Sequence, residues 1–590
     1  MKNRKMALGI TAAATAGFIG LASVYGAAVS AHIRPGRNGE TETEETESET
    51  ESFWAWVDEL AETKDMGVET GSMMMAAAEY DGGYAEPVIL NWNTEEYSTV
   101  EETGFRTVKQ YPFSTFGMDV DTASYALLRR NILDDTMEWM PEDGIRIEEM
   151  INYFNYDYEM PQGDDTFSIT AQIAPCPWNK DTKLLLVGLQ AKDIPKEEIP
   201  DQNLVLLVDT SGSMYDENKL PLAVDALKLL LEDLNEHDSI SLVTYAGSSE
   251  VLLEGVKCTE DGKDEIRAAL DMLEASGGTY GETGIRTAYD LAQEFYAEGA
   301  NNRVLLLTDG DFNLGQTDDS ELVKLVQEKA ESRIFLSILG FGAGNYNDAL
   351  AEELADKGNG NYSYIDSDME ARRVMGGALK GTLNTVAKDA KIQIDFNPAQ
   401  IKGYRQIGYE NRQMDAEDFE DDTKDGGEVG AGQQVTALYE LVMADSDFEI
   451  RSTKSRYEQT EETAQTKAQE NEQADVVSLA IAGETEAEGG KKEASFEDEY
   501  LTVSIRYKDP DAEESRLQEL PVDATAELDE MSDNMSWAGG VAQAGMLLRG
   551  SEYAGSSDWE EVRSRLRELT GGDEFREEFI YLLGRASQHD

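Results

Sequence analysis

The middle of the chain alternates between apolar runs and amphipathic stretches, from about residue 203 to about residue 388. The runs at 204–208 and 303–307 are largely apolar, whereas 219–234 and 321–330 carry apolar residues at helical spacing. An unbroken apolar run of this length fits a strand that is buried on both faces, as in a parallel sheet. Regular alternation of such strands with helices predicts an α/β domain with a doubly wound, mostly parallel sheet.

Two segments of this central region fit a hairpin. Residues 240–245 and 251–256 have strand composition, and a short turn containing Gly247, Ser248 and Ser249 lies between them. A connection this short joins antiparallel neighbours, so one of the two is expected to be an antiparallel edge strand. The central region ends in a predicted helix at 369–386.

The flanking segments contain shorter elements of both kinds. On the amino-terminal side, the pattern predicts a helix at 125–133 with Arg129 and Arg130 facing outward, and further elements at 145–154, 167–173 and 184–189. On the carboxy-terminal side, it predicts antiparallel strands and then helices, at 391–396, 401–409, 434–442, 500–507, 537–548, 559–569 and 575–585. The predicted fold is therefore an α/β domain flanked by a small α+β module and a β-rich module that ends in helices.

Three stretches do not fit a folded core. Residues 6–33 are apolar and follow three basic residues. Val29-Ser30-Ala31 provides the small residues of a signal-peptidase site. We therefore expect an export signal that, if uncleaved, remains as a membrane anchor. Acidic, Thr-rich tracts at about 38–52 and 452–495 have little apolar surface to bury and are expected to be disordered, although 476–482 within the second is apolar enough for a strand.

These changes in composition and hydrophobic pattern divide the chain into five parts. The predicted parts are a signal peptide or membrane anchor (1–31), an acidic linker (32–85), an N-terminal module (86–200), the α/β domain (201–388) and a C-terminal module (389–590) with its acidic insertion at about 452–495. The expected location is outside the cytoplasm, as a secreted or cell-surface protein.

The amino-acid composition argues against several kinds of partner and site. Among 590 residues, 119 are acidic and 50 are basic, which gives a net charge of −69 and argues against nucleic acid as a partner. The three histidines include two in the terminal segments, so histidine triads and zinc sites are poorly supported. Cys176 and Cys258 lack metal-ligand spacing, and two buried free thiols are expected rather than a disulfide.

Oxygen-bearing side chains follow the apolar strands of the α/β domain. Asp209, Ser211 and Ser213 come directly after the first strand, Thr279 lies in a Gly-rich loop, and Asp309 follows a second strand. All should emerge at the carboxyl edge of the sheet, where ligands bind in folds of this kind. Hydroxyl ligands with nearby carboxylates suit Mg²⁺, or alternatively Mn²⁺ or Ca²⁺, whereas a simple helix-capping turn would explain the first loop alone.

This three-loop pattern resembles the metal-ion-dependent adhesion site (MIDAS) of von Willebrand factor type A (VWA) domains. The resemblance implies that Ser211, Ser213 and Thr279 bind the metal directly and that Asp209 and Asp309 accept hydrogen bonds from metal-bound water. It further implies a protein partner that presents a carboxylate to the metal, and a link between partner binding and movement of the last helix of the domain, 369–386.

Motifs outside the domain resemble one bacterial family of exported VWA proteins. The matching stretches are 119–125, 151–154 and 176–179 in the family's N-terminal module, and 407–412 and 436–440 in its C-terminal module of unknown function. The family implies a binding role but does not name a ligand. We expect no enzyme activity.

Two other functions remain open. A metal-assisted phosphohydrolase could use Asp209 or Asp119 as nucleophile, but no Walker loop is present and no lysine lies in the three site loops. A structural VWA domain with an idle metal site is the third possibility. Asp119 and Asp121 could form a metal site or supply a phosphotransfer nucleophile, but we expect instead that Asp121 or Thr122 caps the helix that follows.

Overall fold

The computed structural model describes residues 101–451 and 496–588, with short gaps at 119–120, 138–139, 279–280, 311–318, 343–346, 379–380, 382, 425, 497, 511 and 556–557. All of these residues belong to one compact unit, Val88–Asp590. The predicted export signal and linker (1–85), the acidic insertion (452–495), Asp119 and Thr279 lie outside the described residues.

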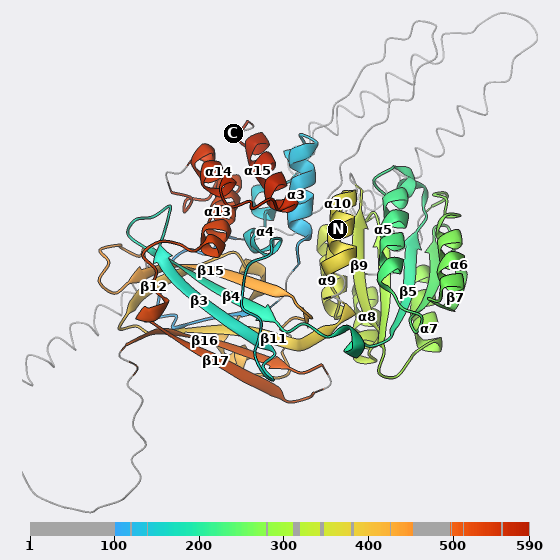
Figure 1. Ribbon diagram of the computed structural model, residues 1–590, viewed down its shortest axis with the longest axis horizontal. Helices are drawn as coiled ribbons and strands as arrows, with labels where there is room; N and C mark the ends of the chain where they lie inside the picture. Colours follow the sequence, from blue (N-terminus) through green and yellow to red (C-terminus); the bar gives the residue numbers. More distant parts are fainter. Residues whose placement is uncertain are drawn as a thin grey trace, which may run out of the picture. The chain divides into compact units, whose positions relative to one another are not determined.

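The central region forms a sheet of six described strands (Figure 1). In spatial order these are β10 (Tyr362–Ile365), β9 (Phe335–Phe341), β8 (Asn301–Thr308), β5 (Gln202–Asp209), β6 (Ser239–Tyr245) and β7 (Ser249–Lys257). Neighbouring strands are parallel except for β6 and β7, which form an antiparallel hairpin at the edge. The predicted parallel sheet and its antiparallel edge are thus confirmed.

Helices cover both faces of this sheet. One face packs against α5 (Leu220–Asp233), α6 (Glu260–Leu270) and α10 (Asp368–Arg373), and the other against α7 (Gly281–Glu294), α8 (Asp319–Glu331) and α9 (Asp348–Lys357). Each face of the sheet has its own hydrophobic core, and alternate residues of β5 pack into the two cores. Leu204 and Leu206 lie in the core on the first face, and Val205 and Leu207 lie in the core on the second. This arrangement explains the unbroken apolar runs, because both faces of each central strand are buried.

The last helix of the domain ends a few residues earlier than predicted and is irregular. α10 ends at Arg373, a π-helical turn follows at Val374–Ala378, Gly381 and Leu383 are again helical, and β11 begins at Thr385, inside the predicted helix at 369–386. Gly376 and Gly377 lie in that turn, and glycine weakens a regular helix.

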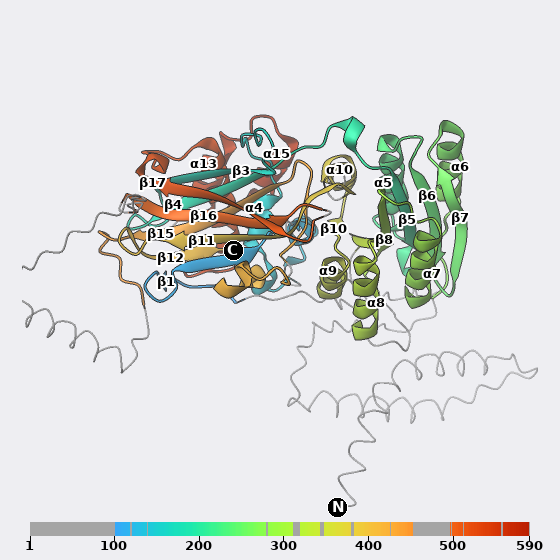
Figure 2. The ribbon, with the colours of Figure 1, turned by 90° about the horizontal axis from the view of Figure 1, so that it is seen from below.

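The flanking segments form a sandwich of two antiparallel sheets (Figures 1 and 2). The strands of the first sheet are β1 (Arg106–Thr107), β12 (Ile401–Ile407), β15 (Gln434–Met443), β4 (Lys183–Ala191) and β3 (Phe167–Pro175). The strands of the second are β13 (Gln413–Met414), β2 (Phe113–Gly117), β11 (Thr385–Phe396), β16 (Glu499–Lys508) and β17 (Ser515–Asp523), and β14 (Val429–Gly430) pairs with β11. Each sheet therefore combines strands from before and after the α/β domain.

Helices cover the outer face of the first sheet. They are α3 (Ala123–Leu133), α4 (Ile147–Asn152), α13 (Asp533–Leu548), α14 (Trp559–Arg567) and α15 (Glu574–Ala586). The helix α3 also contributes Ala123, Ala126 and Leu127 to the core of the α/β domain, so it packs on both the first sheet and the α/β domain.

Cys176 and Cys258 are both buried and free, as expected. Among the described helices, none combines the length and apolar character needed to cross a bilayer.

Candidate metal centre

The first site loop begins at the end of β5. Asp209 is the last residue of that strand, and its carboxylate Oδ1 accepts a hydrogen bond from the backbone N–H of Ser211 at 2.8 Å. A short helical turn, Gly212–Tyr215, follows and brings the hydroxyl oxygens of Ser211 and Ser213 to 2.9 Å from each other. The structure therefore brings these three predicted residues together, with both hydroxyls on one side of a single turn.

Asp209 is a buried carboxylate with spare bonding capacity. Its side chain has no exposed area, and Oδ2 has no hydrogen-bond partner among the described residues. Burial raises the pKa of Asp209 to about 6, and the nearby charge of Asp309 adds to that shift, while hydrogen bonds from Ser211 and from the Tyr245 hydroxyl oppose it. Such an orphaned oxygen is costly unless a ligand or bound water satisfies it.

The Gly-rich loop lies directly beside this turn. The backbone N–H of Ser276 donates to the carbonyl of Thr210 at 2.8 Å, and the N–H of Gly212 donates to the carbonyl of Gly277 at 3.0 Å. A side chain at Gly212 would press on the Gly277 carbonyl, and Gly277 has a φ of +84°, so glycine permits both the turn and the close approach. Thr279 follows two residues later, outside the described residues, and its place in the site stays a prediction.

The third loop brings Asp309 to the same edge. β8 lies parallel to β5, with Leu307 opposite Val208, so Asp309 emerges next to Asp209. Asp309 is completely buried, and its Oδ2 lies 2.9 Å from the ammonium Nζ of Lys219, of which only 6% of the side chain is exposed.

Lys219 is the site residue that sequence reasoning missed. It lies outside the three loops, at the N-cap position of α5, and its side chain makes no capping hydrogen bond there. Helix N-termini favour hydroxyl, amide or carboxylate side chains and disfavour cations. A lysine at the start of a predicted helix is therefore unexpected, and this could have indicated that Lys219 has a role other than helix capping.

The donor set suits a hard divalent cation. Two serine hydroxyls and an unpaired carboxylate oxygen face one edge of the sheet, and oxygen is the ligand type that Mg²⁺ prefers. Among the described residues, no group of three or more His, Cys, Asp or Glu could hold a metal ion. The residues present thus fit the predicted ion, with Lys219 as an additional positive charge.

Comparison with known proteins places this architecture in a family. The family model "von Willebrand factor type A domain" matches 204–311, "von Willebrand factor" matches 91–186, and "Uncharacterized protein YfbK, C-terminal" matches 381–481 and 474–588. The chain is 39% identical over 504 residues to "Uncharacterized protein YfbK" of Escherichia coli (strain K12), which covers 84% of this chain and 81% of that protein. The chain belongs to the YfbK family of VWA-domain proteins.

Other similar proteins match the chain at lower identity. The inter-alpha-trypsin inhibitor heavy chain H4 of Bos taurus is 29% identical over 177 residues, which is 28% of this chain and 19% of that protein. Among solved structures, "von Willebrand factor type A from Catenulispora acidiphila" covers 73% of this chain and 91% of its own, at 14% identity and a TM-score of 0.37.

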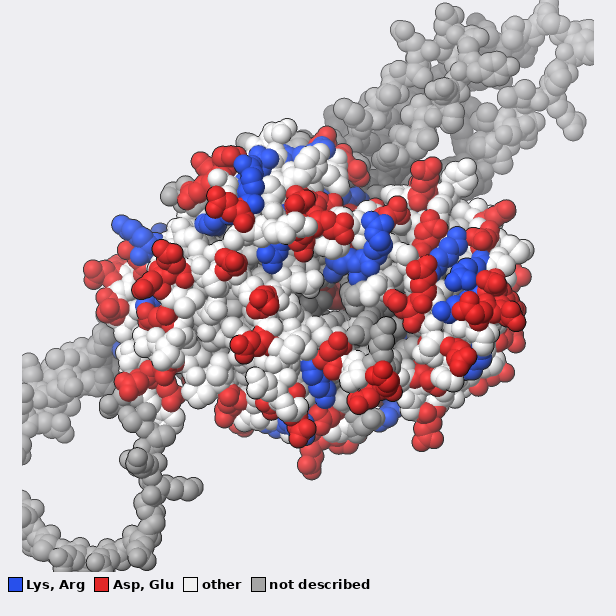
Figure 3. Space-filling view, in the orientation of Figure 1, with Lys and Arg blue, Asp and Glu red and all other residues white. Residues whose placement is uncertain are grey.

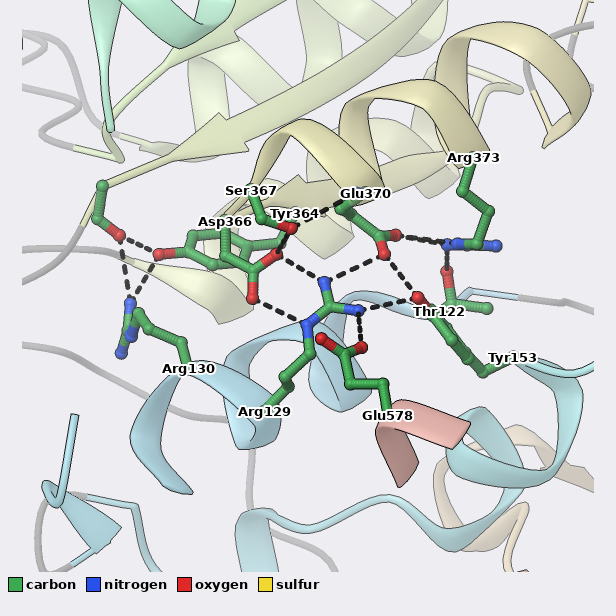
Figure 4. Close-up of polar contacts among 11 residues, drawn as sticks. Thr122, Arg129, Arg130, Tyr153, Tyr364, Asp366, Ser367, Glu370, Arg373 and Glu578 are labelled. Carbon is green, nitrogen blue, oxygen red and sulfur yellow. Dashed lines mark hydrogen bonds and ion pairs between the residues drawn. The ribbon is translucent and has the colours of Figure 1, made fainter. Parts of the chain in front are cut away.

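A second polar cluster joins the VWA domain to α3 and α15 (Figure 4). We call it the Arg129 cluster; it contains Arg129, Tyr153, Asp366, Glu370 and Glu578. The guanidinium of Arg129 donates to both carboxylate oxygens of Asp366, to Glu370 at 2.9 Å, to the Tyr153 hydroxyl at 2.7 Å and to Glu578 at 3.3 Å. Burial alone would raise the pKa of Glu370, but Arg373 and Arg129 hold it below its ordinary value.

The prediction that Arg129 and Arg130 face outward is therefore wrong. Both are buried, because the VWA domain covers the side of α3 that carries them. Nη1 of Arg130 donates to the carbonyl of Gly342 at 3.0 Å and to the Tyr364 hydroxyl at 2.6 Å. Gly342 in turn packs against the stem of Lys219, so α3 reaches the residues that surround the candidate site.

Asp121 has a linking role that the sequence did not indicate. Its carboxylate accepts from the backbone N–H of Tyr362 at 3.3 Å and from Arg412 at 3.2 Å, and Arg412 also reaches Glu352 of α9 at 2.8 Å. Thr122 occupies the N-cap position of α3, but its side chain forms no capping hydrogen bond, so the expected capping role is wrong for Thr122. The motifs at 119–125 and 407–412 thus meet on the surface of the VWA domain.

Two of the remaining motifs, 176–179 and 436–440, meet at Glu440 within the sandwich. This buried carboxylate accepts hydrogen bonds from Trp178, Asn179 and Thr182, and it forms an ion pair with Arg405 at 3.1 Å. The motifs at 176–179 and 436–440 therefore hold the two halves of the first sheet together.

Acidic side chains are widespread on the face of the molecule shown in Figure 3. Lys and Arg side chains stand in small groups among them. Such a surface repels the phosphates of nucleic acid.

Proposed function

We propose that this chain is an adhesion-type protein that binds a protein partner through a divalent cation held at the carboxyl edge of the VWA sheet. Ser211, Ser213 and Thr279 would hold the ion, Mg²⁺ or alternatively Mn²⁺ or Ca²⁺, and Asp209 and Asp309 would accept hydrogen bonds from its water ligands. Bound there, the ion would supply an acceptor site for a carboxylate of the partner. VWA-domain relatives support the coarser role of protein interaction.

One observation carries the metal part of this proposal. Oδ2 of Asp209 is buried without a partner, beside two converging serine hydroxyls, at the sheet edge where α/β folds bind ligands. A protein bears the cost of an unsatisfied buried carboxylate oxygen where a ligand or ordered water completes the bonding. The hydroxyl ligands are neutral, so the ion would keep positive charge for an anionic group of the partner.

Calorimetric titration with Mg²⁺ tests the metal site. The wild-type protein should bind about one ion, and Asp209→Ala and Ser211→Ala should lose that binding. Ser248→Ala is the matched control, because Ser248 is exposed in the β6–β7 turn at the same edge of the sheet. Binding that survives in Asp209→Ala would refute the assignment.

The partner is tested by affinity capture from the native cell surface. The wild-type chain, saturated with Mg²⁺, should retain a defined protein that a chelator releases and that Asp209→Ala does not retain. Retention that is indifferent to both changes would show that the site does not mediate binding.

A metal-assisted phosphohydrolase is the second candidate, and Lys219 is the observation that favours it. This residue brings a cation to a site that also contains Asp209, although its ammonium is committed to Asp309. Hydrolysis of simple phosphate monoesters by the purified protein, lost in Asp209→Asn, would establish this function in place of adhesion.

The proposed location follows from the basic start and apolar stretch at 6–33. We place the folded part outside the cytoplasm, secreted or held at the cell surface. Protease treatment of intact cells should release fragments of it, and full protection would contradict this location.

A further inference from the structure

The buried ion pair between Lys219 and Asp309 is unusual for a cation site. Asp309 is fully buried, Lys219 is nearly so, and their charged atoms lie 2.9 Å apart. The same carboxylate is one of the groups through which the proposed ion would be held. A fixed ammonium and a divalent cation therefore draw on the same negative charge.

The fold holds Lys219 in this position at some local cost. The residue occupies the N-cap of α5, where a positive charge opposes the helix dipole and a hydroxyl or carboxylate would be preferred. Its stem lies over Gly342, which has a φ of +78°, and a Cβ at Gly342 would come within 2.2 Å of Lys219 Cε. Arg130 and Tyr364 both donate to the Gly342 carbonyl and fix that glycine.

We propose that Lys219 is a built-in counter-cation that competes with the divalent metal for Asp309 and thereby lowers the metal affinity of the site. This inference rests on the proposed metal site. In the metal-free site, Lys219 leaves one net negative charge on the pair of aspartates, where two would otherwise attract the ion. Metal binding loosens the Lys219–Asp309 pair, and the ammonium that remains nearby raises the positive charge of the loaded site.

Calorimetry with Mg²⁺ on Lys219→Met tests the competition. Met keeps the length of the stem and removes the charge, so the variant should bind Mg²⁺ about tenfold more tightly than the wild type, or better. Lys228→Met is the control, because it removes the same charge from a partly exposed position of the same helix and should leave the affinity within about twofold. A merely structural role for Lys219 would weaken binding or leave it unchanged, and either result overturns the inference.

A second measurement uses the wild-type protein. It is independent of any change in the position of Asp309 that removal of Lys219 would cause. Acetylation of the wild-type protein by acetic anhydride, followed by mass spectrometry, should label Lys219 slowly without metal and several-fold faster at saturating Mg²⁺. Lys228 should be labelled at the same rate in both conditions. Unchanged protection of Lys219 at saturating metal overturns the competition. Absence of Mg²⁺ binding in both the wild type and Lys219→Met instead overturns the proposed metal site itself.

Discussion

Replacing Arg129 by Met removes the charge at the centre of the Arg129 cluster and keeps the aliphatic part of the side chain. The change leaves Asp366 and Glu370 in place at the junction between the VWA domain and α3. We expect a large loss of stability, because a buried carboxylate without its counter-ion is strongly disfavoured.

The magnitude follows from the burial of each partner. The Arg129 side chain has no exposed area, and those of Asp366 and Glu370 are 6% and 1% exposed. Removing one member of a buried pair costs about 3–5 kcal/mol. Glu370 retains its contacts with Arg373, so most of the cost arises at Asp366. We therefore expect the free energy of unfolding to fall by about 3 kcal/mol, near the lower end of that range.

Urea unfolding followed by both tryptophan fluorescence and circular dichroism measures this loss, and agreement of the two probes shows whether the transition is two-state. Arg585→Met is the matched control. Arg585 joins α15 to Asp135 after α3, at the exposed rim of the same region, and its removal should leave the midpoint unchanged. A loss for Arg129→Met below about 1 kcal/mol, as for an exposed pair, would refute the reasoning.

Further predictions concern two other sites. Burial, reinforced by the neighbouring Glu410, raises the pKa of Glu148 to about 7, so the folded state holds a proton that the unfolded chain releases near 4.5. Stability should therefore fall as the pH rises from about 4.5 to about 7, and Glu148→Gln should remove this fall, gaining about 2–3 kcal/mol over the wild type at pH 8 but little at pH 4.5. Urea midpoints across this pH range measure the difference, and parallel profiles would contradict it. Tyr215 ends the turn of the first site loop with 79% of its area exposed. We expect Tyr215→Ala to keep Mg²⁺ affinity and to weaken partner binding about tenfold, since exposed aromatic residues at binding sites are frequent hot spots. Surface plasmon resonance with the captured partner checks this, and equal affinities would exclude Tyr215 from the contact.

The VWA sheet could be predicted because its signal is local. Runs such as Leu204–Val208 are apolar at every position, and only burial on both faces explains that pattern. Asp209 and Asp309 could be brought together in advance, because the carboxyl ends of parallel strands meet at one edge. Lys219 could not, since its contact with Asp309 depends on the path of the chain around Gly342.

The orientation of α3 could not be predicted from the sequence. An amphipathic pattern predicts one apolar face that packs on one core, whereas α3 packs on two cores with different faces. Tyr125 and Leu128 pack with the C-terminal helices, and Ala126 and Leu127 pack with the VWA domain. Arg129 and Arg130 then lie in contact regions that supply carboxylate, hydroxyl and carbonyl partners, so their charge no longer marks the solvent side. β2 lies outside the predicted elements, and its pairing with β11 was equally hidden, because an alternating pattern indicates a strand but not its neighbour.

The interleaved sandwich has a consequence for how the protein assembles during synthesis. The strands of the VWA sheet, β5 to β10, are contiguous in the chain, so this domain can close as soon as β10 has been made. Each sandwich sheet must wait for strands made after that point: until then β4 lacks its neighbour β15, and β1 lacks its neighbour β12. The earlier strands expose unpaired edges throughout this interval, which makes it the period of greatest risk of aggregation. A nascent chain stalled after β10 should therefore carry a protease-resistant VWA core, while the segment that precedes it is still cleavable.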